Sequence, residues 1–192
     1  MDRLRCFIAV ELPPEIKAAL TSLENKLKQG DQRLVKWVHP ENIHLTLKFL
    51  GATPVSAVQD VVNRMTKIAA ETSCFALHVG GVGCFPNWQR PQVIWIGLEG
   101  EIEKVASLQR NLEAAVEDLG FRRENRAFVP HLTLGRVRDG TSFQDKQAFG
   151  KWASAAEFSD AGELEVDGLS LMESKLTPSG PIYTRLAFAE LA

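Results

Sequence analysis

Hydrophobic residues recur along the chain with two different spacings. Short segments with alternating or unbroken apolar positions predict strands, and longer segments with an apolar residue every three or four positions predict helices. The expected strands are residues 5–11, 34–38, 43–49, 75–85, 93–98, 131–137, 164–176 and 182–189. The expected helices run from Pro13–Pro14 to Gly30, onward from Pro54, over about 101–119 and over 143–152. This mixture of strands and helices predicts an α+β fold.

The composition is that of a folded domain in water. Of the 192 residues, 45% are hydrophobic and 24% are charged, which is typical of globular proteins. No linker is long or polar enough to divide the chain, so we expect a single domain over residues 1–192. The net charge of −2 excludes a protein that is basic all over, so a phosphate needs a local binding site.

The chain shows no sign of export, membrane insertion or a disulfide framework. Its three cysteines, Cys6, Cys74 and Cys84, are an odd number without the C-x-x-C spacing of zinc sites. The apolar segment 6–10 is too short for a signal peptide and is interrupted by Glu11. No apolar run approaches the ~18 residues of a membrane helix. We therefore expect a cytoplasmic protein without membrane contact, and no segment indicates a protein partner.

One tetrapeptide occurs twice. The sequence His-Leu-Thr-Leu is found at residues 44–47 and at residues 131–134. Because the side chains of a strand alternate between its two faces, His44 and Thr46 share one face while the leucines share the buried face. The second copy repeats this arrangement with His131 and Thr133. A purely structural strand has no reason to repeat the outward polar pair together with the inward leucines, so the doubling indicates function.

Two histidines that face one another can transfer protons at a phosphodiester. The ordinary pKa of imidazole, about 6.5, allows one ring to act as a base and the other as an acid near neutrality. If the strands lie side by side across a pseudo-twofold axis, one ring takes a proton from the nucleophile and the other protonates the leaving oxygen. Each transfer contributes about 10²–10⁴-fold. The threonine hydroxyls donate hydrogen bonds to the non-bridging phosphate oxygens.

A metal site is the main rival interpretation of the two histidines. Two ligands are fewer than the three protein ligands of a catalytic zinc, and no Asp, Glu or Cys stands within either motif. We therefore expect chemistry without a metal or other cofactor.

At the two motifs the sequence resembles the two-histidine phosphoesterase superfamily, which is defined by paired His-x-Thr-x motifs. More narrowly, it resembles the RNA 2′,3′-cyclic phosphodiesterases, also called 2′-5′ RNA ligases. The resemblance extends over nearly the whole chain, through residues 5–9, 42–51, 81–86, 130–136 and 173–174 and Tyr183. It implies a bilobal α+β fold with a pseudo-twofold axis, in which two antiparallel-type sheets flanked by helices surround a central cleft.

The resemblance also implies a reaction. A 2′,3′-cyclic phosphate at an RNA end is hydrolysed to a 2′-phosphomonoester, and the bond to the 3′ oxygen breaks. By the family's assignment, His44 is the proton donor and His131 is the proton acceptor that activates water. The sequence alone leaves this polarity open, because the two tetrapeptides are identical. Many members also join RNA ends through a 2′-5′ bond, so the physiological direction stays open too.

Four further residues are candidates for binding the substrate: Arg136, Lys48, Phe7 and Tyr183. Arg136 matches an arginine of the family's second motif, although strict alternation places it opposite His131 unless Gly135 carries a bulge. Lys48 shares the face of His44 if the alternation continues. Phe7 and Tyr183 are candidates for stacking on a base. The other aromatic candidates are Phe49, Trp88 and Trp95.

Arginines crowd the sequence around the second motif, at positions 122, 123, 126, 136 and 138. They form either a patch that steers phosphate in an otherwise acidic protein or a solvated basic face.

The expected function is therefore a metal-independent RNA 2′,3′-cyclic phosphodiesterase, with RNA bearing a cyclic phosphate end as its partner. Two alternatives stay open: a phosphodiesterase of the same superfamily that acts on a small cyclic nucleotide, and a non-catalytic module that binds RNA ends. The sequence does not specify the natural RNA, its terminal base or the oligomeric state.

Overall fold

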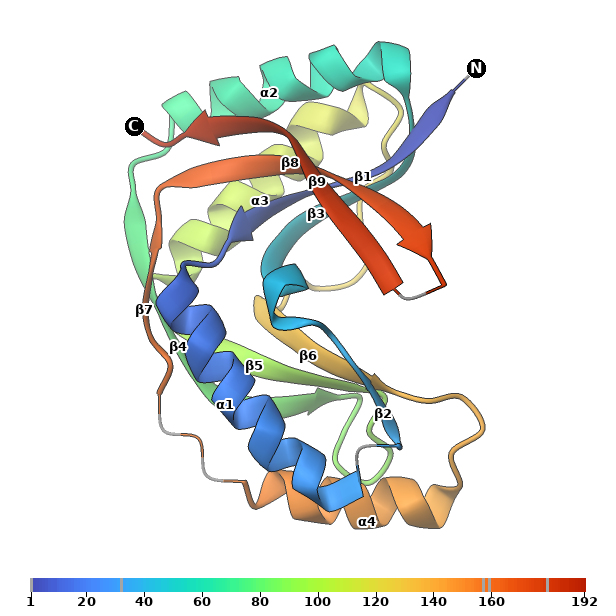
Figure 1. Ribbon diagram of the computed structural model, residues 1–192. Helices are drawn as coiled ribbons and strands as arrows, with labels where there is room; N and C mark the ends of the chain where they lie inside the picture. The colour runs from blue at the N-terminus through green and yellow to red at the C-terminus, as the bar shows by residue number, and fades with distance from the viewer. Residues whose placement is uncertain (1, 32, 157, 159, 179) are drawn as a thin grey trace.

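The computed structural model describes residues 2–31, 33–156, 158, 160–178 and 180–192. Strands and helices alternate along the chain, which confirms the expected α+β class (Figure 1). The strands are β1 (Arg3–Glu11), β2 (Val35–Trp37), β3 (His44–Pro54), β4 (Phe75–Phe85), β5 (Val93–Gly100), β6 (His131–Val137), β7 (Gly162–Val166), β8 (Gly168–Thr177) and β9 (Gly180–Glu190). The helices are α1 (Pro14–Asp31), α2 (Val58–Ala70), α3 (Ile102–Glu117) and α4 (Phe143–Ser154). Two short 3-10 turns cover Pro40–Asn42 and Val55–Ala57.

The described strands form one curled antiparallel sheet rather than the two sheets that we expected. The order is β7-β4-β5-β6-β3-β1-β8-β9, and β2 pairs with β6 on the same side as β3, beyond the single β3–β6 contact. Leu45 of β3 pairs with Leu132 of β6, and this contact joins what would otherwise be two separate sheets. The apolar pattern could not show this junction, because the same pattern suits a strand at a sheet edge and a strand at its centre.

Helices cover the outer side of the curled sheet in two groups (Figure 1). Helices α2 and α3 pack on each other, α2 packs on β8 and β9, and α3 packs on β3. Helices α1 and α4 pack on each other and on β7 and β4, respectively. Each half of the sheet therefore has its own pair of helices and carries one copy of the repeated tetrapeptide.

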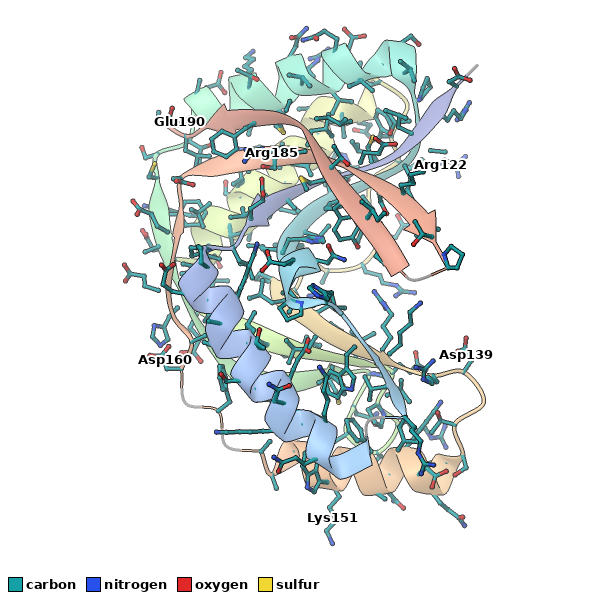
Figure 2. All side chains as sticks on the ribbon, in the orientation of Figure 1. Arg122, Asp139, Lys151, Asp160, Arg185 and Glu190 are labelled. Carbon is teal, nitrogen blue, oxygen red and sulfur yellow. The ribbon has the colours of Figure 1, made fainter. Side chains whose placement is uncertain are left out.

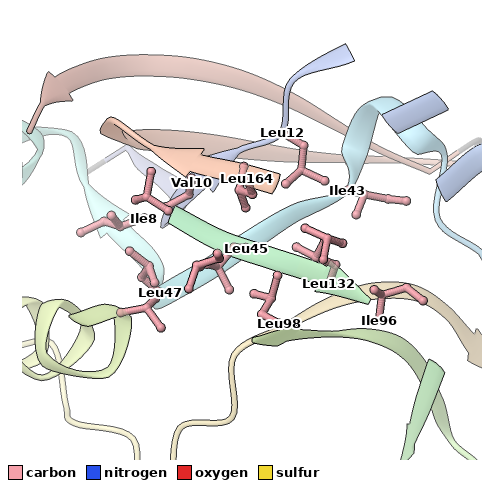
Figure 3. Packing of buried hydrophobic residues seen from close by; sticks show 14 of the residues in the cluster. Ile8, Val10, Leu12, Ile43, Leu45, Leu47, Ile96, Leu98, Leu132 and Leu164 are labelled. Atoms are coloured by element: carbon pink, nitrogen blue, oxygen red, sulfur yellow. The ribbon is translucent and has the colours of Figure 1, made fainter. Parts of the chain in front are cut away.

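The leucines of both motifs lie in the core between sheet and helices. Leu45, Leu47, Leu132 and Leu134 are all at most 3% exposed and belong to one cluster of buried apolar side chains. Figure 3 shows Leu45, Leu47 and Leu132 packed among residues of β1, β5 and β7. The expectation that the leucines point inward is confirmed, and the histidines and threonines consequently point to the opposite side.

One predicted strand was wrong. The segment 164–176 forms two strands, because the chain leaves the sheet at Asp167 between β7 and β8. Strand β7 pairs with β4 at one edge, whereas β8 pairs with β1 and β9 in the other half. Both strands bury apolar side chains, so the pattern runs on through the break. Within the described ranges, no helix is long and apolar enough to cross a membrane.

Candidate functional site

The two histidines and two threonines meet where β3 and β6 pair. Because Leu45 faces Leu132 in an antiparallel register, extending that register by one residue places His44 beside Thr133 and Thr46 beside His131. All four side chains are half-buried and partly accessible. We call this side of the sheet, defined by His44, Thr46, His131 and Thr133, the histidine face.

Each imidazole is fixed by the same hydrogen bond. Nδ1 of His44 lies 2.8 Å from the carbonyl oxygen of Asn42, and Nδ1 of His131 lies 2.7 Å from that of Val129. A carbonyl oxygen only accepts, so Nδ1 carries the proton and donates in both cases. The neutral ring therefore keeps its lone pair on Nε2, which is the atom available for proton transfer.

Burial dominates the protonation of both rings. It lowers the pKa of His44 to about 4, while the hydrogen bond to Asn42 and the charge of Glu11 act in the opposite direction. Burial also lowers the pKa of His131, the hydrogen bond to Val129 raises it, and the charge of Arg136 lowers it further. Both rings are therefore neutral at pH 7 without a substrate. The two histidines differ in their charged neighbour, which is acidic for His44 and basic for His131.

The threonine hydroxyls are free to bind a ligand. Among the described residues, no side chain or backbone group forms a hydrogen bond with the hydroxyl of Thr46 or Thr133, and neither hydroxyl is buried without a partner. Two unengaged donors thus stand beside two imidazoles, an arrangement that can hold the oxygens of a phosphate.

A β-bulge follows the threonine in each motif. Thr46 pairs with Ala9 but Lys48 pairs with Ile8, so Leu47 is the extra residue. Thr133 pairs with Trp95 but Gly135 pairs with Ile94, so Leu134 is the extra residue of the second motif. An extra residue shifts the alternation of every side chain that follows it.

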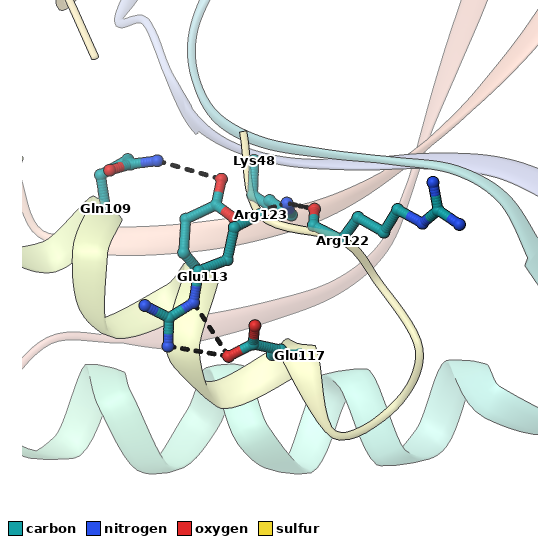
Figure 4. Close-up of polar contacts among 6 residues, drawn as sticks. All are labelled: Lys48, Gln109, Glu113, Glu117, Arg122 and Arg123. Carbon is teal, nitrogen blue, oxygen red and sulfur yellow. Dashed lines mark hydrogen bonds and ion pairs between the residues drawn. The ribbon is translucent and has the colours of Figure 1, made fainter. Parts of the chain in front are cut away.

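The first bulge places Lys48 on the wrong side for the role that we predicted. Lys48 is 2% exposed, and its Nζ donates to Glu113 Oε2 at 2.6 Å and to the carbonyl oxygen of Arg122 at 2.6 Å (Figure 4). It points into the core toward α3 rather than to the histidine face, where it was expected to contact the substrate. Phe49 takes the outward position and is 55% exposed.

The second bulge brings Arg136 to the histidine face. The sequence allowed this position only if a bulge interrupted the alternation near Gly135, and the bulge lies at Leu134. A Cβ on Gly135 would meet Val35 Cγ1 at 2.6 Å, so Gly135 faces the core. Its neighbour Arg136 is exposed on the other side. There its positive charge lowers the pKa of His131 and that of Tyr183.

Phe7 and Tyr183 form an aromatic wall around His44. The Phe7 ring stacks on the imidazole with 4.6 Å between ring centroids, and Tyr183 meets His44 edge-on at 5.3 Å and Phe7 at 5.0 Å. Phe7 is only 3% exposed, so the prediction that it stacks on a base was wrong, and its ring packs against the imidazole instead. Tyr183 is half-buried, and burial raises the pKa of its hydroxyl while the charges of Arg5 and Arg136 lower it.

Sequence reasoning missed several residues of the site. Glu11 pairs directly with His44 across β1 and β3, and its carboxylate accepts from Ser170 Oγ and from Arg185 Nη1. Phe85 meets His131 edge-on at 5.0 Å. The positive charge of Arg5 lowers the pKa of the Tyr183 hydroxyl. The two-residue period of β1 places Arg5 and Glu11 on the same side as Phe7, so that signal was present in the sequence.

The arginines around the second motif do not form one patch. Arg123 is engaged with Glu117, at 2.9 Å from Nε (Figure 4), and Arg138 Nε donates to the carbonyl oxygen of Arg33. Arg122 lies beside the half of the sheet that contains β8 and β9, far in Figure 2 from Asp139 at the end of β6. In the part of the chain that the structure describes, no three His, Cys, Asp or Glu side chains gather into a possible metal site.

The comparison with protein families finds a clear match. The family model described as LigT-like phosphoesterase matches the chain twice, over residues 10–95 and 96–183. Each matched segment contains one His-Leu-Thr-Leu copy.

Curated relatives match over almost the whole chain. A protein of Methanothermobacter thermautotrophicus named RNA 2′,3′-cyclic phosphodiesterase is 36% identical over 182 residues, 95% of this chain and 96% of its own length. A protein of the same name from Archaeoglobus fulgidus is 34% identical over 97% of this chain and 100% of its own length.

Solved structures share the fold. The crystal structure of TT0787 of Thermus thermophilus has a TM-score of 0.77 and 31% identity, and the match covers 97% of both chains. E. coli LigT complexed with 3′-AMP has a TM-score of 0.78 at 24% identity, over 100% of this chain and 99% of that one.

Proposed function

Because the chain belongs to the LigT-like phosphoesterase family, we propose that it hydrolyses the 2′,3′-cyclic phosphate at an RNA end to a 2′-phosphomonoester. One observation carries the proposal: two imidazoles and two threonine hydroxyls share one face at the β3–β6 pair. Within the described chain, Nε2 of each ring and both hydroxyls form no hydrogen bond with the protein. The names of the curated relatives support the choice of RNA as substrate.

The reaction needs one proton removed and one supplied. Nε2 of His131 takes a proton from water as the water oxygen bonds to phosphorus. The bond from phosphorus to the 3′ oxygen breaks, and Nε2 of His44 gives its proton to that oxygen. Each ring keeps its Nδ1 hydrogen bond throughout, which holds the ring orientation while Nε2 changes protonation. A proton exchange with solvent then restores both rings.

The charged neighbours of the two rings support this direction of proton flow. Glu11 lies beside His44 and favours its protonated form, and Arg136 acts on His131 and favours its neutral form. Burial alone keeps His44 neutral, so the negative charge of the bound phosphodiester is what raises its pKa into the range of a general acid.

The remaining residues bind the substrate in this proposal. The hydroxyls of Thr46 and Thr133 donate to the non-bridging oxygens, where negative charge accumulates in the transition state. Arg136 supplies a guanidinium on the same face, toward the phosphate backbone of the substrate. Tyr183 contacts the terminal nucleoside at the half of the sheet that holds His44, while Phe7 supports the imidazole.

The test is an oligoribonucleotide with a 2′,3′-cyclic phosphate end, incubated with the protein in excess chelator. We expect a 2′-phosphate product, and we expect His44→Ala and His131→Ala to lower kcat by about 10²–10⁴-fold each. Full activity in either variant would reject the acid–base pair. Loss of turnover in chelator would show that a metal is required.

The same experiment separates the alternatives. Turnover confined to small cyclic nucleotides would favour the related phosphodiesterase. Binding of the cyclic-phosphate RNA without product would identify a module that recognises RNA ends. Adding a 5′-hydroxyl RNA and looking for a 2′-5′ linked product would measure the reverse, ligating reaction.

A further inference from the structure

A second cationic residue lies beside Arg136. Strand β2 runs antiparallel to the C-terminal end of β6 (Figure 1). Within this pair of strands, Lys36 pairs directly with Arg136. Val35 is 1% exposed and Trp37 packs against the core, whereas Lys36 is exposed. Lys36 therefore points to the same side as Arg136, which is the histidine face.

Gly135 makes this neighbourhood possible. Its missing side chain leaves room for Val35 and Trp37, since a Cβ would lie 2.6 Å from Val35 Cγ1 and 3.2 Å from Trp37 Cε3. The first motif has Lys48 at the position that corresponds to Gly135. The long side chain of Lys48 fills the equivalent space beside β3 and donates a hydrogen bond to the carbonyl oxygen of Arg122. Only the second motif, within the described chain, has a strand such as β2 beside it.

No side chain among the described residues neutralises the pair of cations. Like charges directly opposite one another on neighbouring strands destabilise a sheet. The other cross-strand neighbour of Arg136 is Val93, and among the described residues no ion pair or hydrogen bond engages the side chain of Lys36 or Arg136. Such an arrangement is stabilised by an anion that binds both side chains at once.

We propose that Lys36 and Arg136 bind a second phosphate, namely the phosphodiester that precedes the terminal cyclic phosphate in the RNA. The proposal rests on the proposed function and defines its substrate further: an RNA strand rather than a nucleoside cyclic phosphate.

The spacing along the sheet fits this second site. Thr133 pairs with Trp95 and Arg136 pairs with Val93, and these two partners are two residues apart on β5. The positions of Thr133 and Arg136 along the sheet are therefore about 7 Å apart. Lys36 lies one further strand away, at about 5 Å. The cyclic phosphate at the histidines and the next phosphate at Lys36 are then one nucleotide apart along the strand.

Two half-buried aromatic rings lie beside His131, across β6 from Lys36. Trp95 and Phe85 have ring centroids 5.1 Å apart, and both lie near His131. A base of the strand thus finds aromatic rings near His131, and the next phosphate finds two cations, a combination of stacking and charge by which proteins hold single-stranded RNA.

The test compares two substrates in one series: a trinucleotide with a 2′,3′-cyclic phosphate end and the matching nucleoside 2′,3′-cyclic phosphate. We expect Lys36→Gln to lower kcat/KM for the trinucleotide about tenfold and to leave the value for the nucleoside cyclic phosphate unchanged. The slope of log affinity against log salt for the trinucleotide should fall by about 0.7, as for one lost contact to a single strand. Lys36→Glu should lower trinucleotide turnover further, and Lys36→Arg should restore it.

Lys67→Gln on α2 is the matched control, because this exposed lysine belongs to the other half of the molecule. Binding is measured separately by anisotropy of a labelled trinucleotide that ends in a 2′-phosphate. Equal losses for both substrates, or no loss with Lys36→Gln, would overturn the second site. Absence of turnover by the unmodified protein would instead count against the proposed function, and the binding measurement would still decide the role of Lys36.

Discussion

Leu45 and Leu132 face each other across the β3–β6 pair, and both side chains are completely buried. Their contact sets the register that places each imidazole of the histidine face beside the threonine of the other strand. The packing of the core therefore determines the geometry of the histidine face, and substitutions in either region are expected to change stability or activity.

The burial of His44 predicts how stability depends on pH. Because the folded pKa is lowered from 6.5 to about 4, the unfolded chain binds more protons between these values. The stability associated with the neutral ring is fully present above pH 6.5 and is lost as the pH falls toward 4, by up to about 3 kcal/mol. Urea unfolding at pH 7 and pH 4.5 should show that His44→Gln weakens this dependence. An identical pH dependence in both proteins would contradict the burial of a neutral ring.

The hydroxyls of Thr46 and Thr133 are expected to act on the transition state. Thr46→Val and Thr133→Val keep the shape of the side chain, and each should lower kcat about 10²–10³-fold with little change in KM. Thr→Ser at either position should restore most of the rate, because serine keeps the hydroxyl. Steady-state kinetics with a cyclic-phosphate oligonucleotide measures this.

The control for the threonine variants is Thr66→Val on α2, an exposed position that should leave kcat unchanged. If the valine variants keep the full kcat, the hydroxyls do not stabilise the transition state and the prediction is wrong.

The buried pair of Lys48 and Glu113 is expected to stabilise the fold rather than contact substrate. The side chains are 1% and 7% exposed, so Lys48→Met leaves an unpaired buried carboxylate and should cost about 3–5 kcal/mol of unfolding free energy. Adding Glu113→Leu should recover much of that loss, although Gln109 then loses its hydrogen bond to Glu113. Urea unfolding of the single and double variants measures the coupling.

The exposed pair of Lys104 and Glu101 is the comparison, with side chains 49% and 43% exposed. Lys104→Met should cost less than about 1 kcal/mol. Equal losses at the two lysines would show that Lys48 is accessible to water after all.

The glycine of the second motif is expected to tolerate no side chain. In Gly135→Ala the new Cβ meets Val35 Cγ1 at 2.6 Å, so β2 must move away from β6, at a cost of about 1–3 kcal/mol. Combining it with Val35→Ala should cost less than the sum of the single variants, because the smaller side chain relieves the contact. Hydrogen exchange of the β2 amides reports the separation. Strict additivity would contradict the close packing.

Much of the local structure could be predicted from the sequence. The bounds of β4 and β6 agree with the pattern, because their apolar runs begin and end at turns that the chain itself signals. The inward leucines of both motifs also follow from the two-residue period of a strand. The family resemblance was likewise carried by the motifs, and the family match confirms it.

The face of Lys48 and the face of Arg136 could not be predicted in the same way. Strict alternation places Lys48 outward and Arg136 inward, and the structure reverses both, because a bulge at Leu47 and another at Leu134 each insert one residue. A bulge depends on how two neighbouring strands twist against each other, and no local pattern records it.

The sequence by itself thus determined which segments form strands and that two identical His-Thr pairs share an outward face, because both properties depend only on the spacing of neighbouring residues. Only the tertiary structure decided that the two strands pair in one sheet, that Glu11 and Arg136 stand beside different histidines, and that Lys36 joins Arg136. Those relationships depend on strand register between segments distant along the chain, which is fixed by packing of the whole core.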